Sequence, residues 1–444
     1  MADDATQAVE RWLERELGAK VLEIGKQARW RPVWFARVEL GGAPRELCVR
    51  GDRIDARIGF TLEHEMSLQR LLQERGIPTP RVHGWIDAPR AYAMDAVPGE
   101  PHFEGASTDE RDRAMDHYMQ SLAAIHALDV EPFARAGILR AARPEEAGRV
   151  GIATYERAYR ATKKQPDALL EFALAWLRRN PPPAPARESV VVWDSGQFHQ
   201  RAGRIEAVLD LEIGHIGDPM MDLAGFRMRS SVIDFGDFDR LYDAYARHGG
   251  VRVDRAAIQH HHFAFTLTNQ LAFHAALADP PPGSDYMTNM QWCAETNIYA
   301  TEALGEMLGV ALGEVEMPEP RRTPASVGHA HLVRWLRHFE AADALAQHEV
   351  RIAFRLARHL ERVHEIGDAV EQANLDDLAE LLGRRPRDAF EGEAELERFA
   401  LADDGRHDAE LVRVFHRRAR RYGMLLGPAG SAIARHNPIA GFGA

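Results

Sequence analysis

Cysteine and long apolar runs are both scarce in this sequence. Among its 444 residues there are only two cysteines, Cys48 and Cys293, so a disulfide framework beyond one bridge is excluded. No apolar run reaches the roughly 18 residues that a membrane-spanning helix requires. The acidic start MADDATQAVERWLEREL lacks the apolar core of a signal peptide. We therefore expect a cytoplasmic protein without a membrane partner.

Lysine and positive charge are in short supply as well. Lysine occurs at four positions only, and 55 basic residues face 67 acidic ones, which gives a formal net charge of -12. Since nucleic-acid phosphates attract basic surfaces, this balance argues against a nucleic-acid partner. The hydrophobic share of 45% in a chain of this length is enough for two or three domains with a buried core.

The first part of the chain has the pattern of an antiparallel sheet with one inserted helix. Alternating segments around AKVLEI, WFARVEL and RELCVRG predict three strands, and PTPRVHGWI and AYAMDAV predict two more. Between them, TLEHEMSLQRLLQERG has the spacing of an amphipathic helix. We assign residues 1–97 to this first domain.

The rest of the chain is mainly helical in pattern, with one exception. In the stretch VVWDSGQFHQRAGRIEAVLDLEIGHIGDPMMDLA, residues 191–224, two strand-like runs are expected to meet in a hairpin through HQRAGR. The Pro-rich segment EMPEPRRTPAS, residues 316–326, is the best linker candidate. We therefore assign residues 98–318 to a second domain and residues 319–444 to a helical extension.

Four aspartates lie in the exceptional stretch, each in a different local setting. Apolar strand-like runs precede Asp194 and Asp210, Asp218 lies in a Gly-Asp-Pro turn, and Asp222 opens a helical pattern. A carboxylate directly after a buried strand can coordinate Mg²⁺, which favours oxygen ligands. This stretch is therefore the first candidate for a functional site.

The order of these segments resembles that of the aminoglycoside phosphotransferase and choline kinase-like family. The strongest match is VLDLEIGHIGDPMMDLA, which is similar to the family motif I-D-W-E-x-A-x-x-G-D-P-x-x-D-L-A. Three further segments, LEHEMSLQRLLQERGIPTPRVHGW, AYAMDAVPGE and SLAAIHALDV, also resemble family segments, and the resemblance covers roughly residues 20–310. It implies an α+β, protein-kinase-like two-lobe fold with an antiparallel-sheet N-lobe and a mainly helical C-lobe. The extra C-terminal helical region is not covered.

For the N-lobe, the resemblance implies a nucleotide-binding role for four residues. Arg50 matches the basic residue on the third strand that neutralises nucleotide phosphates, and Glu65 matches the helical glutamate that holds it. The alternative for these two is a plain surface ion pair. The backbone groups of Asp95 and Val97 match the hinge positions that bind adenine.

For the C-lobe, the resemblance implies a catalytic and a metal-binding carboxylate. Asp194 matches the residue that orients the attacking hydroxyl and accepts its proton, and Asp210 matches the magnesium ligand. Asp222 matches the residue that braces the catalytic loop through its backbone, Asp218 is expected to stabilise its own turn, and His126 matches a buried structural histidine.

The catalytic loop departs from the family pattern H-G-D-x-x-x-x-N. Val192 and Trp193 replace the His and Gly, and the fifth residue after Asp194 is His199 instead of the metal-binding Asn. The next strand-end aspartate follows Asp194 by 16 positions, slightly fewer than is usual in the family, so Gln197 is the alternative metal ligand. An amide oxygen suits Mg²⁺ better than a neutral imidazole, and both candidates stay open.

The turn expected to cover the nucleotide phosphates also departs from the pattern. The segment EIGKQARWRPVWF contains a single glycine, Gly25, whereas a Gly-rich turn lets backbone N–H groups approach phosphates closely. Lys26, Arg29 and Arg31 are candidates to supply positive charge there.

A run of three histidines, residues 260–262, resembles a metal-binding motif. Consecutive helical residues point in three directions, so these side chains cannot chelate one ion together. One of them stays a candidate to line a substrate pocket.

These residues predict an ATP- and Mg²⁺-dependent phosphotransferase that phosphorylates a hydroxyl group of a small molecule. A hydroxylated acyl-CoA or another small alcohol is the candidate substrate. The altered loop favours the alternative of a pseudokinase, or a nucleotide- or ligand-binding module without phosphotransfer. The extension is expected to pack on the C-lobe, to form a homodimer contact or to cover the substrate cleft.

Overall fold

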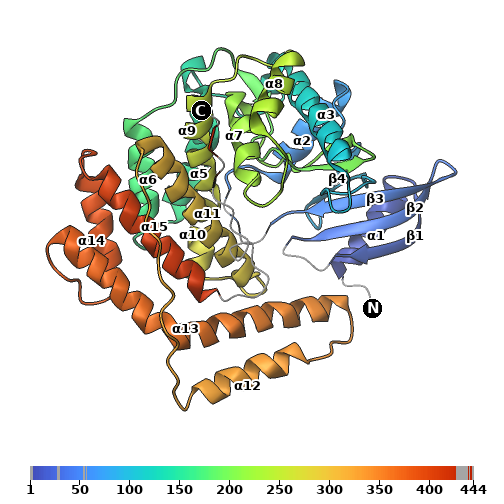
Figure 1. Cartoon of the computed structure of the whole chain (residues 1–444). Coiled ribbons are helices and arrows are strands. Elements are labelled where there is room, and N and C mark those ends of the chain that lie inside the picture. Colours follow the sequence, from blue (N-terminus) through green and yellow to red (C-terminus); the bar gives the residue numbers. More distant parts are fainter. Residues whose placement is uncertain are drawn as a thin grey trace.

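A computed structural model describes residues 4–27, 31–53, 56, 58–426, 439 and 441–442. Figure 1 shows a sheet domain at one side of the molecule and helices gathered at the other, with four further helices at the C-terminal end. This arrangement confirms the expected α+β, two-lobe fold with a helical extension. Among the helices of the described residues, none combines the length and the apolarity needed to cross a lipid bilayer.

The N-lobe is a five-stranded antiparallel sheet with the strand order β1-β2-β3-β5-β4. Its strands are β1 (Lys20–Lys26), β2 (Val33–Leu40), β3 (Ala43–Gly51), β4 (Val82–Ile86) and β5 (Ala91–Asp95). Gly41 and Gly42 both have positive φ angles, as a two-residue hairpin turn between β2 and β3 requires.

Two helices complete the N-lobe. Helix α1 (Asp4–Arg15) buries Val9 and Leu13 in one cluster with Trp34 of β2. Helix α2 (Leu62–Glu74) follows β3 and begins after the N-cap Thr61, whose hydroxyl accepts a hydrogen bond from a first-turn N–H.

The C-lobe consists of helices around two short two-stranded ladders. Its helices are α3 (Thr108–His126), α4 (Glu131–Arg135), the 3-10 helix η1 (Pro144–Arg149), α5 (Val150–Thr162), α6 (Ala168–Arg179), α7 (Met220–Arg229), α8 (Phe238–Arg247), α9 (Arg255–Thr266), α10 (Thr268–Ala278) and α11 (Tyr286–Leu308). The ladders pair β6 (Ser189–Val191) with β9 (His215–Gly217), and β7 (Phe198–Arg201) with β8 (Arg204–Val208).

The ladder pairing corrects one expectation about strand partners. The strand-like run before Asp194 does not form a hairpin with the run before Asp210, because β6 pairs with β9 instead. The hairpin through HQRAGR is formed by β7 and β8, which both follow Asp194. Asp194 therefore lies in a loop between two separate ladders, and Asp210 lies just after the second one.

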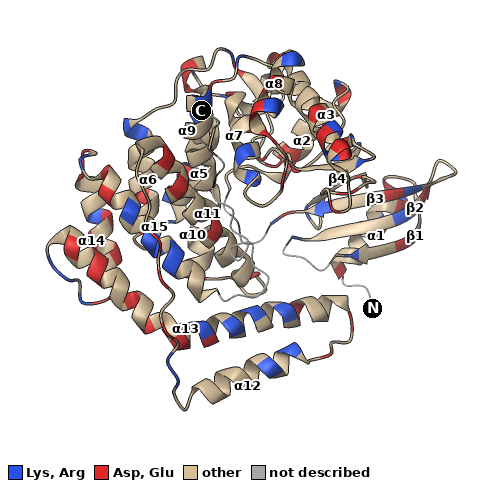
Figure 2. Ribbon diagram, in the orientation of Figure 1, with Lys and Arg blue, Asp and Glu red and all other residues tan. Residues whose placement is uncertain are grey.

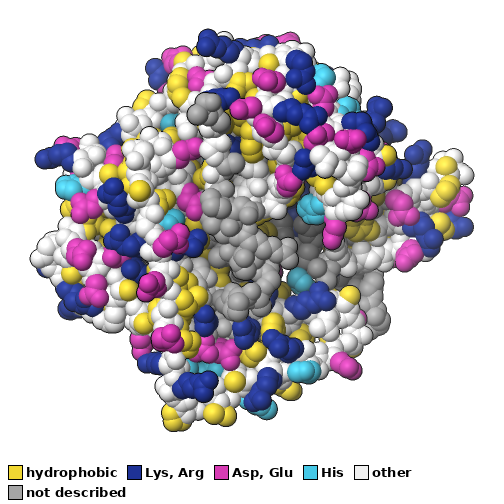
Figure 3. Space-filling model, in the orientation of Figure 1, with side chains coloured by type: hydrophobic (Ala, Val, Ile, Leu, Met, Phe, Trp, Pro, Cys, Tyr) yellow, Lys and Arg dark blue, Asp and Glu magenta, His cyan; other side chains and the backbone are white. Residues whose placement is uncertain are grey.

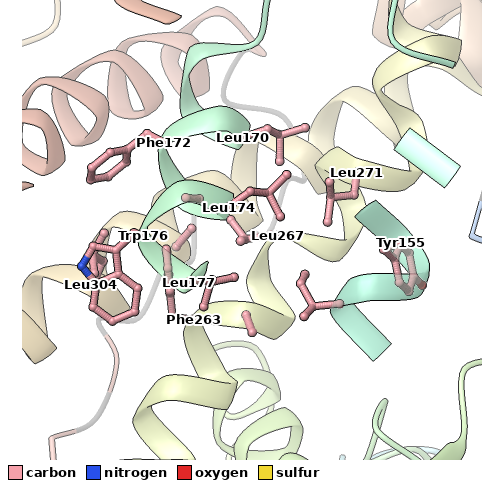
Figure 4. Packing of buried hydrophobic residues seen from close by; sticks show 14 of the residues in the cluster. Tyr155, Leu170, Phe172, Leu174, Trp176, Leu177, Phe263, Leu267, Leu271 and Leu304 are labelled. Atoms are coloured by element: carbon pink, nitrogen blue, oxygen red, sulfur yellow. The ribbon is translucent and has the colours of Figure 1, made fainter. Parts of the chain in front are cut away.

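The extension shares the hydrophobic core of the C-lobe. It contains α12 (Ser326–Arg337), α13 (Ala344–Leu382), α14 (Ala389–Ala402) and α15 (Asp408–Leu425). Leu396 of α14 and Phe415 of α15 belong to the same buried cluster as Phe172 of α6, whose surroundings are drawn in Figure 4. The extension thus packs on the C-lobe, while the division at residue 319 stays a prediction.

Arg355 of helix α13 makes hydrogen bonds to the C-lobe. Figure 2 shows basic residues recurring along this helix. Arg355 donates to the hydroxyl of Thr288 at 2.6 Å and to the side chain of Gln291 at 2.6 Å, both on α11.

Acidic and basic side chains are interspersed over the face of the molecule seen in Figure 3.

Candidate active site

Asp222 fixes the backbone of the loop that carries Asp194. One carboxylate oxygen accepts the N–H of Trp193 at 2.5 Å and the other accepts the N–H of Val192 at 3.1 Å. His126 donates to the same carboxylate at 2.9 Å and accepts from the hydroxyl of Tyr245, and it is fully buried. The bracing role of Asp222 and the structural role of His126 are therefore as expected.

Trp193 occupies a backbone conformation that favours glycine. Its φ angle is +58°, which is rare for a bulky residue and explains why a glycine suits this position. The indole ring is 1% exposed and packs edge-on against Tyr155 and His215. Gly151 is required beside it, because a Cβ atom there would lie 2.3 Å from the indole. The buried packing of the indole thus stabilises a backbone conformation that is unfavourable for tryptophan.

Gln197 bridges the two carboxylates proposed for catalysis and metal binding. Its amide nitrogen donates to Asp194 at 2.6 Å and to Asp210 at 3.0 Å. The two aspartates, 16 positions apart in sequence, are thereby brought to one point. Asp210, like Trp193, has a positive φ angle, of +56°.

The second oxygen of Asp194 is paired with Arg229, which the sequence did not single out. Arg229 is the last residue of α7 and also donates to the carbonyl of Ser195 at 3.2 Å. It follows Asp222 by seven residues, which places both on one helix face. This spacing is the signal through which the sequence could have identified Arg229.

Arg50 lies between the lobes and contacts a carboxylate in each. Its Nε atom is 2.7 Å from Glu65 of α2, and its Nη2 atom is 2.5 Å from Asp210. The hydroxyl of Tyr92, opposite Arg50 on β5, donates to Glu65 at 3.2 Å. With Glu65 2% exposed, this contact is a buried one, unlike the surface ion pair considered as the alternative.

Glu212 forms ion pairs with three arginines at this point. The sequence did not single out this glutamate. Arg31 lies 2.8 Å from it, Arg53 lies 2.7 Å from it and Arg50 lies 3.5 Å from it. Three guanidinium groups of the N-lobe therefore converge on carboxylates of the C-lobe segment 210–212. Phosphate groups entering here would meet three guanidinium groups that are already paired with three carboxylates, those of Glu65, Asp210 and Glu212.

The charges of this cluster shift the pKa values of its members. Burial opposes the charge of Arg50, but Glu65, Asp210 and Glu212 outweigh it and raise the pKa of Arg50 well above its ordinary value. Burial likewise favours protonation of Asp210, but the arginines, Arg50 foremost, hold its pKa below the ordinary value. Asp210 is therefore an ionised oxygen donor, the form in which a carboxylate binds a cation.

The hinge residues lie at the end of β5. The N–H of Asp95 donates to the carbonyl of Arg81 at 2.9 Å, so this group is already used within the sheet edge. The carbonyl of Val97 accepts from Nδ1 of His199 at 2.9 Å. The N–H of Val97 has no partner among the described residues and is the group left for an adenine contact.

The two candidates for the second metal ligand are thus separated in space. Gln197 lies with the carboxylates, whereas His199 faces the hinge. The metal role of either residue stays a prediction. Of the phosphate-turn candidates, Arg31 reaches the cluster, Lys26 lies over the ring of Trp34, and Arg29 is outside the described residues.

The three consecutive histidines have three unrelated partners. His260 donates to the carbonyl of Asn180 at 2.7 Å, His261 donates to Asp218 at 3.0 Å, and His262 accepts from Arg227 at 3.4 Å. They cannot form one metal site, as expected. Within the described ranges, no group of three or more His, Cys, Asp and Glu side chains converges on a metal position.

Comparison with known proteins gives both a family and relatives. The model of the phosphotransferase enzyme family matches residues 35–261. Acyl-CoA dehydrogenase family member 11 from Rattus norvegicus is 27% identical over 176 residues, 37% of this chain and 22% of that protein. Acyl-CoA dehydrogenase family member 10 from Mus musculus is 26% identical over 182 residues, 37% of this chain and 16% of that protein. The chain spans about a fifth of the length of these curated relatives.

The solved structures to which this chain is similar include two phosphotransferases. A macrolide 2'-phosphotransferase from Brachybacterium faecium is 20% identical, with 65% of this chain and 97% of that chain covered and a TM-score of 0.46. An aminoglycoside-3'-phosphotransferase of type VIII is 20% identical, with 60% and 100% covered and a TM-score of 0.44. Similarity at this level is not evidence for the fold, which is assigned from the chain's own sheet order and helices.

Proposed function

Because this chain belongs to the phosphotransferase enzyme family, we propose that it transfers a phosphoryl group from ATP to a hydroxyl group of a small molecule. The observation that carries the proposal is the meeting of Asp194 and Asp210 at the amide of Gln197, next to the cation of Arg50. A positioned carboxylate, an ionised metal ligand and a phosphate-binding cation are the parts that this chemistry needs.

Each part has a proposed role. Asp194 orients the attacking hydroxyl and accepts its proton. Arg50, held by Glu65, contacts the nucleotide phosphates, while the N–H of Val97 contacts the adenine. The N–H of Asp95 is bonded within the sheet, so Asp95 would contribute through its carbonyl only. These groups hold and orient the substrates, and the chain itself forms no bond to the transferred phosphoryl group.

The donors present at Asp210 fit magnesium. A carboxylate with a lowered pKa is a hard oxygen ligand, which Mg²⁺ prefers. Gln197 would add its amide oxygen once its amide group, whose nitrogen faces both carboxylates here, is turned over. When bound, the ion neutralises the negative charge of the phosphates. Asp210 and Gln197 are the residues that would hold it.

The acceptor is proposed to be a hydroxylated acyl-CoA, with other small alcohols as the next class to test. The support is that the curated relatives carry the name acyl-CoA dehydrogenase family members 10 and 11. We further propose a homodimer contact through α12, whose Val327 is 70% exposed and whose Trp335 is 57% exposed.

A pseudokinase is the second candidate function. It is favoured by the replacement of the family's His-Gly by Val192 and Trp193. It is also favoured by the internal neutralisation of both carboxylates, Asp194 by Arg229 and Asp210 by Arg50. A nucleotide would then bind without transfer.

Thermal denaturation with ATP, with and without Mg²⁺, tests binding first. ATP binding raises the apparent Tm by linkage, and no shift under any of these conditions rules out the phosphotransferase. Transfer from labelled ATP to a hydroxyacyl-CoA or to a panel of alcohols then separates the two candidates. Asp194→Asn is expected to abolish transfer and keep the ATP-induced shift, whereas Asp234→Asn, at an exposed aspartate, is the matched control.

A further inference from the structure

A cavity of about 610 Å³ lies between the C-lobe and the extension. Its lining comes from the first turn of α6 and the segment before it, and from α10, α11, α13, α14 and α15, and none of it belongs to the transfer site described above. Leu169, Leu277, Met290, Val363 and Phe415 give the cavity mainly apolar walls. The volume is in the range of small-molecule sites in proteins.

One wall carries a hydrogen-bond network that starts at Asp167. The Asp167 carboxylate, the N-cap of α6, accepts the N–H of Leu170 at 3.0 Å. It also accepts from Nδ1 of His274 at 3.0 Å and from the amide nitrogen of Gln270 at 2.9 Å. A carboxylate can only accept here, so each of these neighbours must present a donor.

Because Gln270 and His274 donate to Asp167, the direction of their remaining hydrogen bonds is fixed. With its nitrogen toward Asp167, Gln270 presents its oxygen to Asn297, whose amide nitrogen donates to it at 3.2 Å. The oxygen of Asn297 is therefore turned away from the network. In the same way, in the tautomer of His274 with its proton on Nδ1, the Nε2 atom is an acceptor.

Both terminal acceptors line the cavity and lack a partner among the described residues. His274 is 3% exposed, and neither its Nε2 atom nor Oδ1 of Asn297 receives a hydrogen bond there. A buried acceptor without a donor is costly, so native proteins rarely leave two of them at one site. Two convergent acceptors in an apolar cavity are complementary to a ligand that donates.

The extension adds a cation and an exposed apolar side chain to the lining. Arg418 of α15 lines the cavity, is 7% exposed and pairs with Glu393, while its Nη1 atom has no partner in the described chain. Phe390, which also lines the cavity, is 87% exposed. An apolar side chain of this size at the edge of an apolar cavity favours a ligand that is itself largely apolar.

We infer that this cavity binds a small, mainly aliphatic diol, one hydroxyl group of which donates to His274 and the other to Asn297. The site goes beyond the proposed phosphotransfer, since none of its residues takes part in that reaction. The extension completes it, because α13, α14 and α15 supply part of the lining. The hydroxyl oxygens, in turn, are acceptors of the kind that the Nη1 atom of Arg418 lacks.

Isothermal titration of the full-length protein, without nucleotide, with octane-1,2-diol and with 1,2-dimethoxyoctane tests the inference. The diether keeps the chain and both oxygens but cannot donate a hydrogen bond. The diol is expected to bind at least about tenfold more tightly, as loss of even one hydrogen-bond donor at a buried acceptor implies. Asn297→Leu and His274→Phe should each reduce the preference for the diol, while His331→Phe on α12 leaves it unchanged.

Two results would overturn the inference: absence of binding by either compound, and equal affinity for both in the unmodified protein. A third contrary result is a diol preference that survives both substitutions in one chain. Because His274→Phe removes a buried donor to Asp167, circular dichroism and Tm of each variant are measured alongside. If His274→Phe does not fold, Asn297→Leu alone carries the comparison, since Asn297 is less buried and contacts only Gln270 in the network.

Discussion

The guanidinium group of Arg229 is paired with the carboxylate of Asp194, and this contact ties the proposed proton acceptor to the end of α7. Asp222, two turns earlier on α7, holds the backbone of the same loop through the N–H groups of Val192 and Trp193. One helix face therefore positions both the loop and its reactive side chain. The position of Asp194 depends on α7 as much as on the loop itself.

Replacing Arg229 with Gln is expected to lower kcat while changing the KM for ATP little. Burial raises the pKa of Asp194, and Arg229 is the main group that lowers it. Loss of this cation therefore decreases the ionised fraction of Asp194 and removes the contact that holds its carboxylate in place. Removal of one charge-assisted hydrogen bond of about 1.5–3 kcal/mol corresponds to roughly a 10- to 100-fold loss of rate. Steady-state kinetics measure it, with Arg240→Gln at an exposed arginine as control. An unchanged kcat would show that Asp194 does not depend on this pair.

Arg50→Lys is expected to raise the KM for ATP despite conserving the charge. The guanidinium reaches Glu65 through Nε and Asp210 through Nη2 at once, and a lysine ammonium cannot reproduce this fork. Arg37→Lys, on an exposed pair with Glu23, is the matched control. Equal ATP affinity of Arg50→Lys and the unmodified protein, measured by titration calorimetry, would remove Arg50 from the phosphate site.

Trp193→Gly restores the residue type that the family has at this position, yet we expect it to destabilise the protein. Glycine adopts the positive φ angle without strain, which stabilises the protein by about 1–3 kcal/mol. Loss of a buried indole destabilises it by about 3–5 kcal/mol. The free energy of unfolding should therefore fall, as measured by denaturant titration. A variant at least as stable as the unmodified protein would mean that backbone strain outweighs packing in this loop.

Acid conditions are expected to destabilise the protein in part through His215. Burial lowers the pKa of His215 to about 4, so between pH 6.5 and pH 4 the unfolded chain binds a proton that the folded chain does not. Stability from this group is fully present above pH 6.5 and is lost as the pH falls, by up to about 1.4 kcal/mol per pH unit. His215→Asn should flatten the Tm profile in this window, and His331→Asn should not. Equal slopes for all three proteins would contradict the assignment.

The proposed homodimer contact predicts that Trp335→Glu makes the protein monomeric. A charge on this exposed apolar face of α12 would have to be buried without a partner at an interface. Light scattering after size-exclusion chromatography measures the mass, and Leu22→Glu, at an exposed position of β1, is the control. A mass of one chain in the unmodified protein at all concentrations would refute the contact.

The local patterns were sufficient for the lobes and for the candidates of the site. The sequence patterns predicted the five N-lobe strands, three of them from alternating segments, and helical period predicted α2 with Glu65 on it. The strand partners of the C-lobe ladders were not predictable in this way. Residues 189–191, Ser-Val-Val, form a short run, and such a run does not distinguish pairing with β8 from pairing with β9.

The sequence by itself determined the residue types at the site, namely two carboxylates after short strands, a basic residue on β3 and a glutamate on α2. Only the tertiary structure decided that Gln197 rather than His199 lies between Asp194 and Asp210, and that Arg229 and Glu212 join them. The physical reason is distance along the chain. Spacing and periodicity act within an element, whereas the partners of a buried charge are chosen by packing of segments that lie far apart in sequence.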